Sequence, residues 1–211
     1  MTEWLINRPE QSPMARVVLA HGAGAPMDSE FMERVADLLC AAGCEVVRFE
    51  FPYMALRRTM GKRSPPDREA VLLQCWREQL IRLRADLSPV TKWIVGGKSM
   101  GGRMASLVAD ELFVSGLVCF GYPFHPAGKP ERLRTAHLVD LQTPTLIIQG
   151  TRDPLGNKDE VKHYQLSSRI HLHWLDDGDH DLKPRVRSGF TWEQHLRSAT
   201  QALQNFIKQL P

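Results

Sequence analysis

Gly97-Lys98-Ser99-Met100-Gly101 is the stretch that decides the fold, because it is a G-x-S-x-G sequence placed where a strand should turn into a helix. The apolar, β-prone residues 93–96 precede it, and a run compatible with a helix extends from Arg103 to Leu112. A serine on so tight a turn has its hydroxyl held clear of the backbone, and the flanking glycines avoid collisions with the neighbouring strand and helix. Five-residue patterns recur by chance, so the meaning of this one depends on its surroundings.

A serine hydroxyl becomes an effective nucleophile when a histidine removes its proton and a carboxylate orients that histidine. Two later strand-like segments, 144–149 and 170–175, each end in a loop that supplies one of these groups. Asp153 follows the first segment and His180 follows the second, so Ser99, Asp153 and His180 all come after predicted strands. Loops at the carboxyl ends of parallel strands open at one edge of a sheet, and we expect the three side chains to meet there.

The same chemistry needs backbone donors for the negatively charged oxygen that forms on the substrate. The backbone N–H of Met100, the residue after the serine, is the first expected donor. The second should come from an early strand-to-helix loop, and residues 17–24 supply one, with Ala23 preferred and Gly24 in reserve. His21 lies in this loop before the serine, and we expect it to shape the turn rather than to act as the base.

On these residues the chain resembles the α/β-hydrolase superfamily, in which the order along the chain is Ser, then Asp or Glu, then His. The resemblance covers nearly the whole sequence. More narrowly, the chain is similar to small, cap-less, dienelactone-hydrolase-like proteins, above all the group related to testis-expressed protein 30 and the hydrolase-like domain of a chromatin-complex subunit. The stretches that carry this narrower resemblance are His21–Ala25, Phe51–Met54, Pro65–Arg68 and Gly97–Gly102. This narrower resemblance implies the fold but says little about the substrate.

Strand patterns alternate with helix patterns along the chain, which is typical of a parallel sheet covered by helices on both faces. We therefore predict an α/β-hydrolase fold, a doubly wound, mostly parallel sheet of about six to seven strands, in a single domain over residues 1–211. Strands are predicted over 17–21, 45–50, 92–96, 116–120, 144–149 and 170–175, with an extra one near Trp4-Leu5-Ile6 as an alternative. Helices are predicted over about 28–43, after Asp67, from Ser99 onward, near 158–166 and over 192–210.

The segment between the strands at 116–120 and 144–149 is short. It contains only 23 residues. Hydrolases with a helical cap usually insert it about there, so we expect no large cap and an active site that is open or covered only by loops.

A basic loop is predicted to follow the second main strand, from Phe51 to Pro66. Residues 57–68 carry five basic side chains and one acidic one, and the basic ones include Arg57, Arg58, Lys62 and Arg63. One interpretation is a partial lid in which Arg57 and Arg58 attract an anionic acyl or leaving group. The other is a solvated connection, which is what most charge runs are.

Other residues near the expected site leave alternatives open. Tyr122 and Phe124 follow the strand at 116–120, where they either wall an acyl pocket or pack against the sheet edge. The histidines that compete with His180 lie in a strand pattern or in the last helix: His171, His173 and His195.

The glycine-rich motif and the chain that carries it have two further interpretations. A phosphate-binding P-loop needs a glycine at position 92, which is Lys92, so Lys98 is interpreted as a variable position beside the serine. A binding or scaffold protein with a hydrolase-like fold is the second functional alternative. Because all three triad residue types are present, an enzyme is favoured over it, and labelling of Ser99 by a phosphonate probe separates the two.

Composition narrows the functional class. The chain is 43% hydrophobic and 24% charged, which is ordinary for a soluble globular protein, and its net charge of +3 is too small to predict nucleic-acid binding. Apolar runs fall short of the roughly 18 residues that span a bilayer, and residues 1–9 lack a signal-peptide pattern. The four cysteines do not complete a metal site. Together with the triad, these features predict a cytoplasmic serine esterase that acts on a small ester or thioester. We expect it to need no metal or cofactor and to bind neither nucleic acid nor a membrane.

Overall fold

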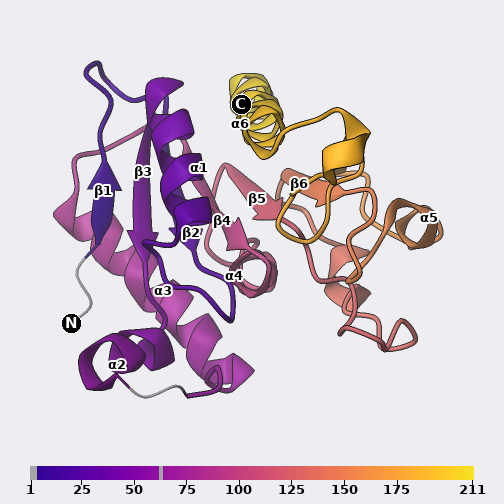
Figure 1. The fold of residues 1–211 in the computed structure, drawn as a ribbon. Helices are drawn as coiled ribbons and strands as arrows, with labels where there is room; N and C mark the ends of the chain where they lie inside the picture. Colours follow the sequence, from indigo (N-terminus) through magenta and orange to yellow (C-terminus); the bar gives the residue numbers. More distant parts are fainter. Residues whose placement is uncertain (1–3, 62–63) are drawn as a thin grey trace.

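The computed structural model describes residues 4–61 and 64–211, so Lys62 and Arg63 of the expected basic loop lie outside the described residues. The described chain forms a 7-stranded sheet with the order β1-β3-β2-β4-β5-β6-β7 (Figure 1). Its strands are β1 (Leu5–Asn7), β2 (Ala15–Ala20), β3 (Cys44–Phe49), β4 (Trp93–Lys98), β5 (Gly116–Phe120), β6 (Thr145–Gly150) and β7 (Ile170–Leu175). β1 pairs antiparallel with β3 and the other pairs are parallel. The prediction of a mostly parallel α/β sheet is confirmed, and the N-terminal strand is present.

Helices cover both faces of this sheet (Figure 1). They are α1 (Glu30–Ala41), α2 (Pro52–Met60), α3 (Glu69–Asp86), α4 (Met100–Ser106), α5 (Lys158–Val161) and α6 (Trp192–Gln209). Successive side chains of a strand point to opposite faces of the sheet, so each central strand contributes residues to two hydrophobic cores. In β2, Val17 and Leu19 pack into the core beneath α1 and α6, whereas Val18 and Ala20 pack into the core beneath α3 and α4. This alternation is why the central strands consist almost entirely of apolar residues.

The helix predictions need three corrections. Residues 51–66, expected to be a loop, contain α2, which has Pro52 in its first turn and ends at Gly61 with a left-handed φ of 67°. Proline at the start and glycine just past the end are the residues that favour such a helix. The helix after Ser99 ends at Ser106. The chain continues to Leu112 as a series of turns, and most of the apolar side chains of these turns are buried. The helix expected near 158–166 ends at Val161.

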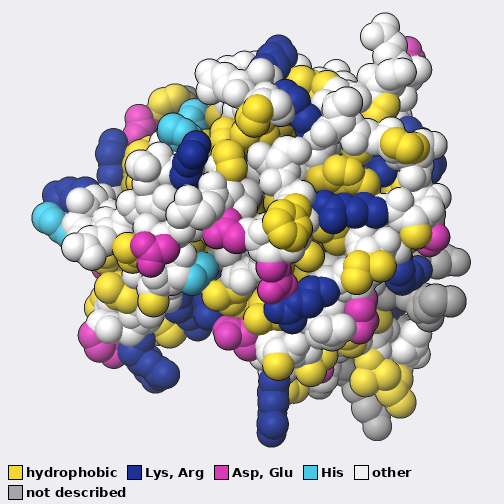
Figure 2. Space-filling model, turned by 180° about the vertical axis from the view of Figure 1, so that it is seen from behind, with side chains coloured by type: hydrophobic (Ala, Val, Ile, Leu, Met, Phe, Trp, Pro, Cys, Tyr) yellow, Lys and Arg dark blue, Asp and Glu magenta, His cyan; other side chains and the backbone are white. Residues whose placement is uncertain are grey.

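Residues 121–143, which join β5 to β6, hold one short 3₁₀ turn at Ala136–Leu138 and otherwise irregular chain. The prediction that no large cap is inserted there is confirmed. Within the residues that the structure describes, no helix is long and apolar enough to cross a membrane. From behind, Lys and Arg side chains are scattered among Asp and Glu side chains (Figure 2).

Candidate active site

Ser99 sits on a strained turn between β4 and α4. Its backbone has φ 51° and ψ −115°, a sparsely populated combination for a residue with a side chain. A Cβ on Gly97 would lie 2.1 Å from the backbone oxygen of Ala20, and one on Gly101 would lie 2.3 Å from that same oxygen. Both positions therefore require glycine, because α4 and the end of β4 press directly on β2. The G-x-S-x-G spacing follows from this contact.

The structure brings Ser99, His180 and Asp153 into one hydrogen-bonded row. His180 Nε2 lies 2.8 Å from Ser99 Oγ, and His180 Nδ1 lies 2.8 Å from Asp153 Oδ2. With Asp153 ionised, the neutral imidazole carries its proton on Nδ1, so Nε2 is free to accept the serine proton. Each side chain comes from the loop at the carboxyl end of its own parallel strand, as the sequence indicated.

Asp153 is completely buried, and every partner of its carboxylate is a donor. Leu155 N–H donates to Oδ1 at 2.8 Å, while Gln149 Nε2 donates to Oδ2 at 2.9 Å beside His180. Gln149 is itself buried, and its Oε1 accepts the Tyr122 backbone N–H at 2.7 Å. The amide of Gln149 thus ties the end of β5 to the loop after β6 and holds Asp153 in one orientation.

Lys98 anchors the loop that carries His180. Its ammonium donates to the backbone oxygen of His180 at 2.6 Å and lies 3.3 Å from Asp181 Oδ1 and 5.6 Å from the centre of the Phe31 ring. Burial lowers the pKa of Lys98, an effect that nearby Asp181 opposes. Lys98 is therefore more than a variable position next to the nucleophile, because it fixes the backbone of the proposed base.

Replacing Lys98 by methionine is expected to lower kcat/KM on an activated ester about 10- to 100-fold, because a displacement of His180 of about 1 Å weakens proton transfer that strongly. Methionine keeps the apolar stem but leaves the His180 carbonyl without its donor. Steady-state kinetics would show the loss, and circular dichroism would verify the fold. The matched control is Lys183→Met, an exposed lysine on the same loop. Unchanged kcat/KM in Lys98→Met would contradict the anchoring role.

The other acidic and imidazole groups have different partners. Asp177 forms an ion pair with Arg185, which holds the pKa of Asp177 down at about 2. His173 Nε2 lies 3.0 Å from Ser198 Oγ, and His195 Nδ1 lies 2.9 Å from the Leu182 backbone oxygen. His171 belongs to β7 and is exposed. None of these histidines approaches Ser99 in the way that His180 does.

The early loop is shaped by His21, and Ala23 lines the same pocket as Ser99 and Met100. His21 is fully buried; its Nδ1 lies 2.7 Å from the Gly22 backbone oxygen, and its Nε2 accepts the Phe51 N–H at 3.2 Å. Burial lowers the pKa of His21, which keeps the ring neutral and leaves Nε2 as an acceptor. The Tyr53 hydroxyl donates to the Ala23 backbone oxygen at 3.0 Å.

The pocket that contains Ser99 has a volume of about 480 Å³. Its wall combines apolar side chains with a few charged ones. The lining residues are Ala23, Pro66, Asp67, Glu69, Leu72, Ser99, Met100, Arg103, Met104, Pro123, Pro126, Ala127, Arg134 and Leu155. The four side chains expected to bind substrate, Arg57, Arg58, Tyr122 and Phe124, are not among them.

Arg57 and Arg58 lie on α2 and have other partners. Arg58 pairs with Glu50 at 2.6 Å and with Asp28 at 2.8 Å, and these carboxylates raise the pKa of its guanidinium. Arg57 donates to the Ser64 backbone oxygen at 2.9 Å. The charge of Arg58 is therefore paired with carboxylates of the fold, and neither arginine lines the Ser99 pocket.

Tyr122 and Phe124 are both completely buried, with ring centres 4.8 Å apart. They pack in the core instead of forming a wall that a ligand can reach. Tyr122 nevertheless supports the site from behind, because its N–H is bonded to Gln149 and its hydroxyl donates to the Arg134 backbone oxygen at 3.0 Å.

Sequence reasoning missed most of the pocket wall and several polar side chains that line or support the site. These polar side chains are Tyr53, Lys98, Arg103, Arg134 and Gln149. Gln149 carried a detectable signal, since a polar residue near the end of the apolar run Thr145–Gly150 needs a buried partner. Arg134 carried none, because it lies in an irregular segment whose course depends on tertiary contacts.

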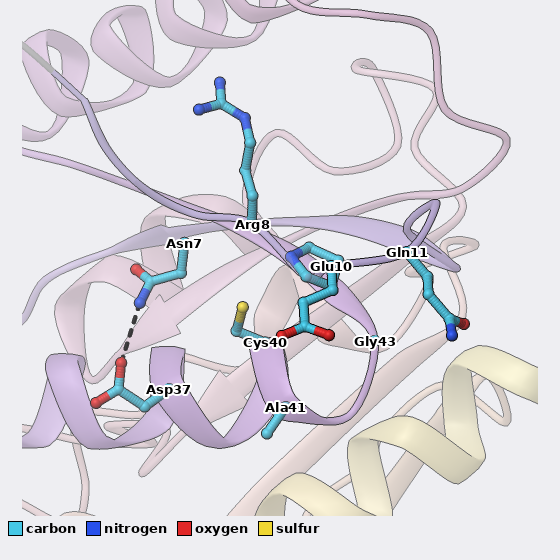
Figure 3. A pocket seen from close by; sticks show the side chains of 9 residues that line it. Asn7, Arg8, Glu10, Gln11, Asp37, Cys40, Ala41 and Gly43 are labelled. Carbon is cyan, nitrogen blue, oxygen red and sulfur yellow. Dashed lines mark hydrogen bonds between the residues drawn. The ribbon is translucent and has the colours of Figure 1, made fainter.

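A second hollow, of about 590 Å³, lies between the segment after β1 and helix α1 (Figure 3). Its lining includes Asn7, whose amide donates to Asp37 Oδ1 at 3.0 Å, and Cys40. Burial raises the pKa of the Cys40 thiol, which keeps it protonated and unreactive near neutral pH. This hollow shares no residue with the Ser99 pocket, and its groups do not form a nucleophile–base pair.

A family model described as "Alpha/beta hydrolase domain" matches residues 13–208. Three solved structures are similar over almost the whole chain. An alpha-beta serine hydrolase homologue from Coxiella burnetii has a TM-score of 0.74 at 19% identity, covering 97% of this chain and 90% of that one. A serine hydrolase without lid from Xanthomonas campestris has a TM-score of 0.73 at 22% identity, covering 100% of this chain and 90% of that one. Dienelactone hydrolase from Anabaena variabilis has a TM-score of 0.74 at 20% identity, covering 99% of this chain and 92% of that one. At such identities the similarity shows the fold.

Proposed function

Because the chain belongs to the alpha/beta hydrolase domain family, we propose that it is a serine hydrolase that cleaves a small ester or thioester. Ser99 is the proposed nucleophile, His180 the proton acceptor and donor, and Asp153 the group that orients His180. The observation that carries the proposal is the pair of 2.8 Å hydrogen bonds that join Ser99 Oγ to His180 and His180 to Asp153. Such a row is what converts an unreactive hydroxyl into a nucleophile.

In the first half of the reaction, Ser99 Oγ attacks the carbonyl carbon while His180 Nε2 takes the hydroxyl proton. Asp153 stabilises the imidazolium that results. The tetrahedral intermediate collapses when His180 returns this proton to the departing alcohol or thiol, and the acyl group remains bonded to Ser99. In the second half, His180 Nε2 takes a proton from water, the hydroxide attacks the acyl carbon, and Ser99 leaves with the proton restored.

The N–H groups of Met100 and Ala23 are the proposed donors to the oxygen that becomes negative in both intermediates. Met100 is the first residue of α4, where a backbone N–H has no acceptor within the helix. The Ala23 N–H shares a peptide plane with the Gly22 carbonyl, and the 2.7 Å contact of that carbonyl with His21 Nδ1 supports the proposed orientation of the second donor.

Within the family, we place the chain with the group related to testis-expressed protein 30 and the hydrolase-like domain of a chromatin-complex subunit. The stretches His21–Ala25 and Gly97–Gly102 support this placement. We also propose that residues 1–211 act as one catalytic domain, because the sheet and both cores draw on segments from the beginning to the end of the chain.

A fluorophosphonate probe, followed by peptide mass spectrometry, tests the proposal directly. We expect one covalent adduct, on the peptide that contains Ser99, and no adduct in heat-denatured protein. A series of nitrophenyl esters from acetate to octanoate should be hydrolysed, with the shorter acyl chains preferred because the pocket holds only about 480 Å³. Absence of both labelling and hydrolysis would favour the scaffold alternative.

A further inference from the structure

Arg134 lines the Ser99 pocket and has no partner for its positive charge among the described residues. It lines the pocket and is half-buried, yet its guanidinium makes no hydrogen bond or ion pair with any residue in 4–61 or 64–211. Its backbone is fixed on both sides, since its N–H donates to the Phe124 backbone oxygen at 2.7 Å and its carbonyl accepts the Tyr122 hydroxyl at 3.0 Å. The Arg134 guanidinium nitrogens are not among the buried side-chain atoms that lack a partner, so they reach solvent and can exchange water for an anionic ligand.

A second guanidinium lies on the same pocket wall. Arg103 follows Ser99 by one helical turn, its N–H bonded to the Ser99 backbone oxygen at 3.0 Å, and it pairs with Glu69 at 2.8 Å. Its Nε is buried without an acceptor among the described residues. Burial and the charge of Arg103 both lower the pKa of Arg134, so the two cations repel each other across the pocket. An anion bound between them would relieve that repulsion.

The donors left without an acceptor indicate what kind of anion fits. The charged lining residues are Asp67, Glu69, Arg103 and Arg134, so the formal charges cancel, and the preference rests on which donors are unfilled. Glu69 already pairs with Arg103, and Asp67 Oδ2 accepts the Tyr53 N–H at 2.9 Å. One guanidinium remains free. Its single charge and planar pair of donors match a carboxylate better than a phosphate monoester, which carries about −1.5 to −2.

We propose that this pocket selects an ester or thioester with a free carboxylate, which Arg134 binds while Arg103 shapes the subsite. The inference rests on the proposed hydrolase function and names its substrate class. Residues one helical turn apart have Cβ atoms about 5–6 Å apart, so Arg103 lies close to the nucleophile on the same side of α4. A carboxylate bound between Arg134 and Arg103 would share one pocket with the scissile carbonyl. Half-esters of short dicarboxylic acids carry both groups in one small molecule.

The kinetic test compares the mono-nitrophenyl ester of glutaric acid with the same ester whose free carboxylate is capped by methyl. In the wild type we expect kcat/KM to favour the acidic ester, and Arg134→Met to reduce that preference about 10- to 100-fold, as loss of a charge-assisted hydrogen bond does. The kcat/KM of each protein on the capped ester serves as its own reference, so the quantity compared is the ratio of the two esters. Arg132→Met removes the same charge from an exposed position two residues away and should keep the preference, which separates direct binding from long-range steering.

A binding measurement on the Ser99→Ala protein keeps the inference testable without turnover. Calorimetric titration with monomethyl glutarate and with dimethyl glutarate should show at least about tenfold tighter binding of the monoanion, lost when Arg134→Met is added. If both nitrophenyl esters are hydrolysed with the same preference in wild type and Arg134→Met, the carboxylate subsite is wrong and the hydrolase proposal stands. If neither ester is hydrolysed faster than by Ser99→Ala, the hydrolase proposal fails, and equal affinity for the two methyl esters then overturns the subsite as well.

Discussion

Ser99→Ala is expected to lower kcat/KM toward nitrophenyl acetate by at least about a thousandfold and to abolish labelling by a phosphonate probe, since loss of a triad nucleophile has effects of this size elsewhere. Without the hydroxyl, His180 Nε2 has no proton to accept and no acyl-enzyme forms. The substitution removes a single oxygen atom, whose bond is to His180 at 2.8 Å, so the fold should remain intact. Steady-state kinetics, mass spectrometry of the probe adduct and a thermal melt measure the three effects.

Ser198→Ala is the matched control for that experiment. Ser198 also has a hydroxyl within hydrogen-bond distance of an imidazole, at 3.0 Å from His173 Nε2, but it lies on α6 outside the Ser99 pocket. Its activity should equal that of the wild type. Hydrolysis by Ser99→Ala at the wild-type rate would show that another group is the nucleophile.

Asp153→Asn is expected to lower kcat about 10³- to 10⁴-fold while the protein still folds. All partners of the Asp153 carboxylate are donors, namely the Leu155 N–H, the Gln149 amide and His180 Nδ1. An asparagine must point its own NH₂ at one of them. When it faces His180, the ring keeps its proton on Nε2, directed at Ser99, and can no longer accept the serine proton. The pH dependence of kcat and the imidazole proton signals would report the wrong tautomer.

The control for Asp153→Asn is Asp176→Asn, which removes the same charge from an exposed residue just after β7. It should leave kcat nearly unchanged. Equal losses in the two variants would mean that general electrostatics, rather than orientation of His180, explains the effect. Full activity of Asp153→Asn would rule out its proposed role.

The sheet could be predicted because each central strand is a short apolar run between turn residues and helix patterns. β5 and β7 match the predicted ranges, and the other main strands differ by only one or two residues at each end. The helix α2 could not be found in this way. Its exposed face includes Arg58, Thr59 and Met60, and the charges there resembled a solvated loop. Arg58 pairs with Glu50 and Asp28, which are distant enough in sequence that no local pattern shows them.

The site was predictable where chemistry forces both residue type and order, as for Ser99, Asp153 and His180. The side chains that support them were harder to foresee. Lys98 reaches the backbone of His180, 82 residues away in the chain, and Gln149 reaches Tyr122, 27 residues away. Such contacts depend on how loops from different strands meet at the sheet edge. For the same reason, the cations of the pocket had to be found in the structure, at Arg103 and Arg134 rather than at Arg57 and Arg58.

The backbone of Ser99 has a consequence for stability. A residue with φ 51° and ψ −115° costs about 1–3 kcal/mol relative to a relaxed conformation, and only glycine adopts such angles without that cost. Judged by folding alone, glycine would be the better residue at the tip of this turn. A serine there lowers the stability of the folded state in exchange for an accessible hydroxyl. The strain at this one residue therefore supports the catalytic role proposed for Ser99.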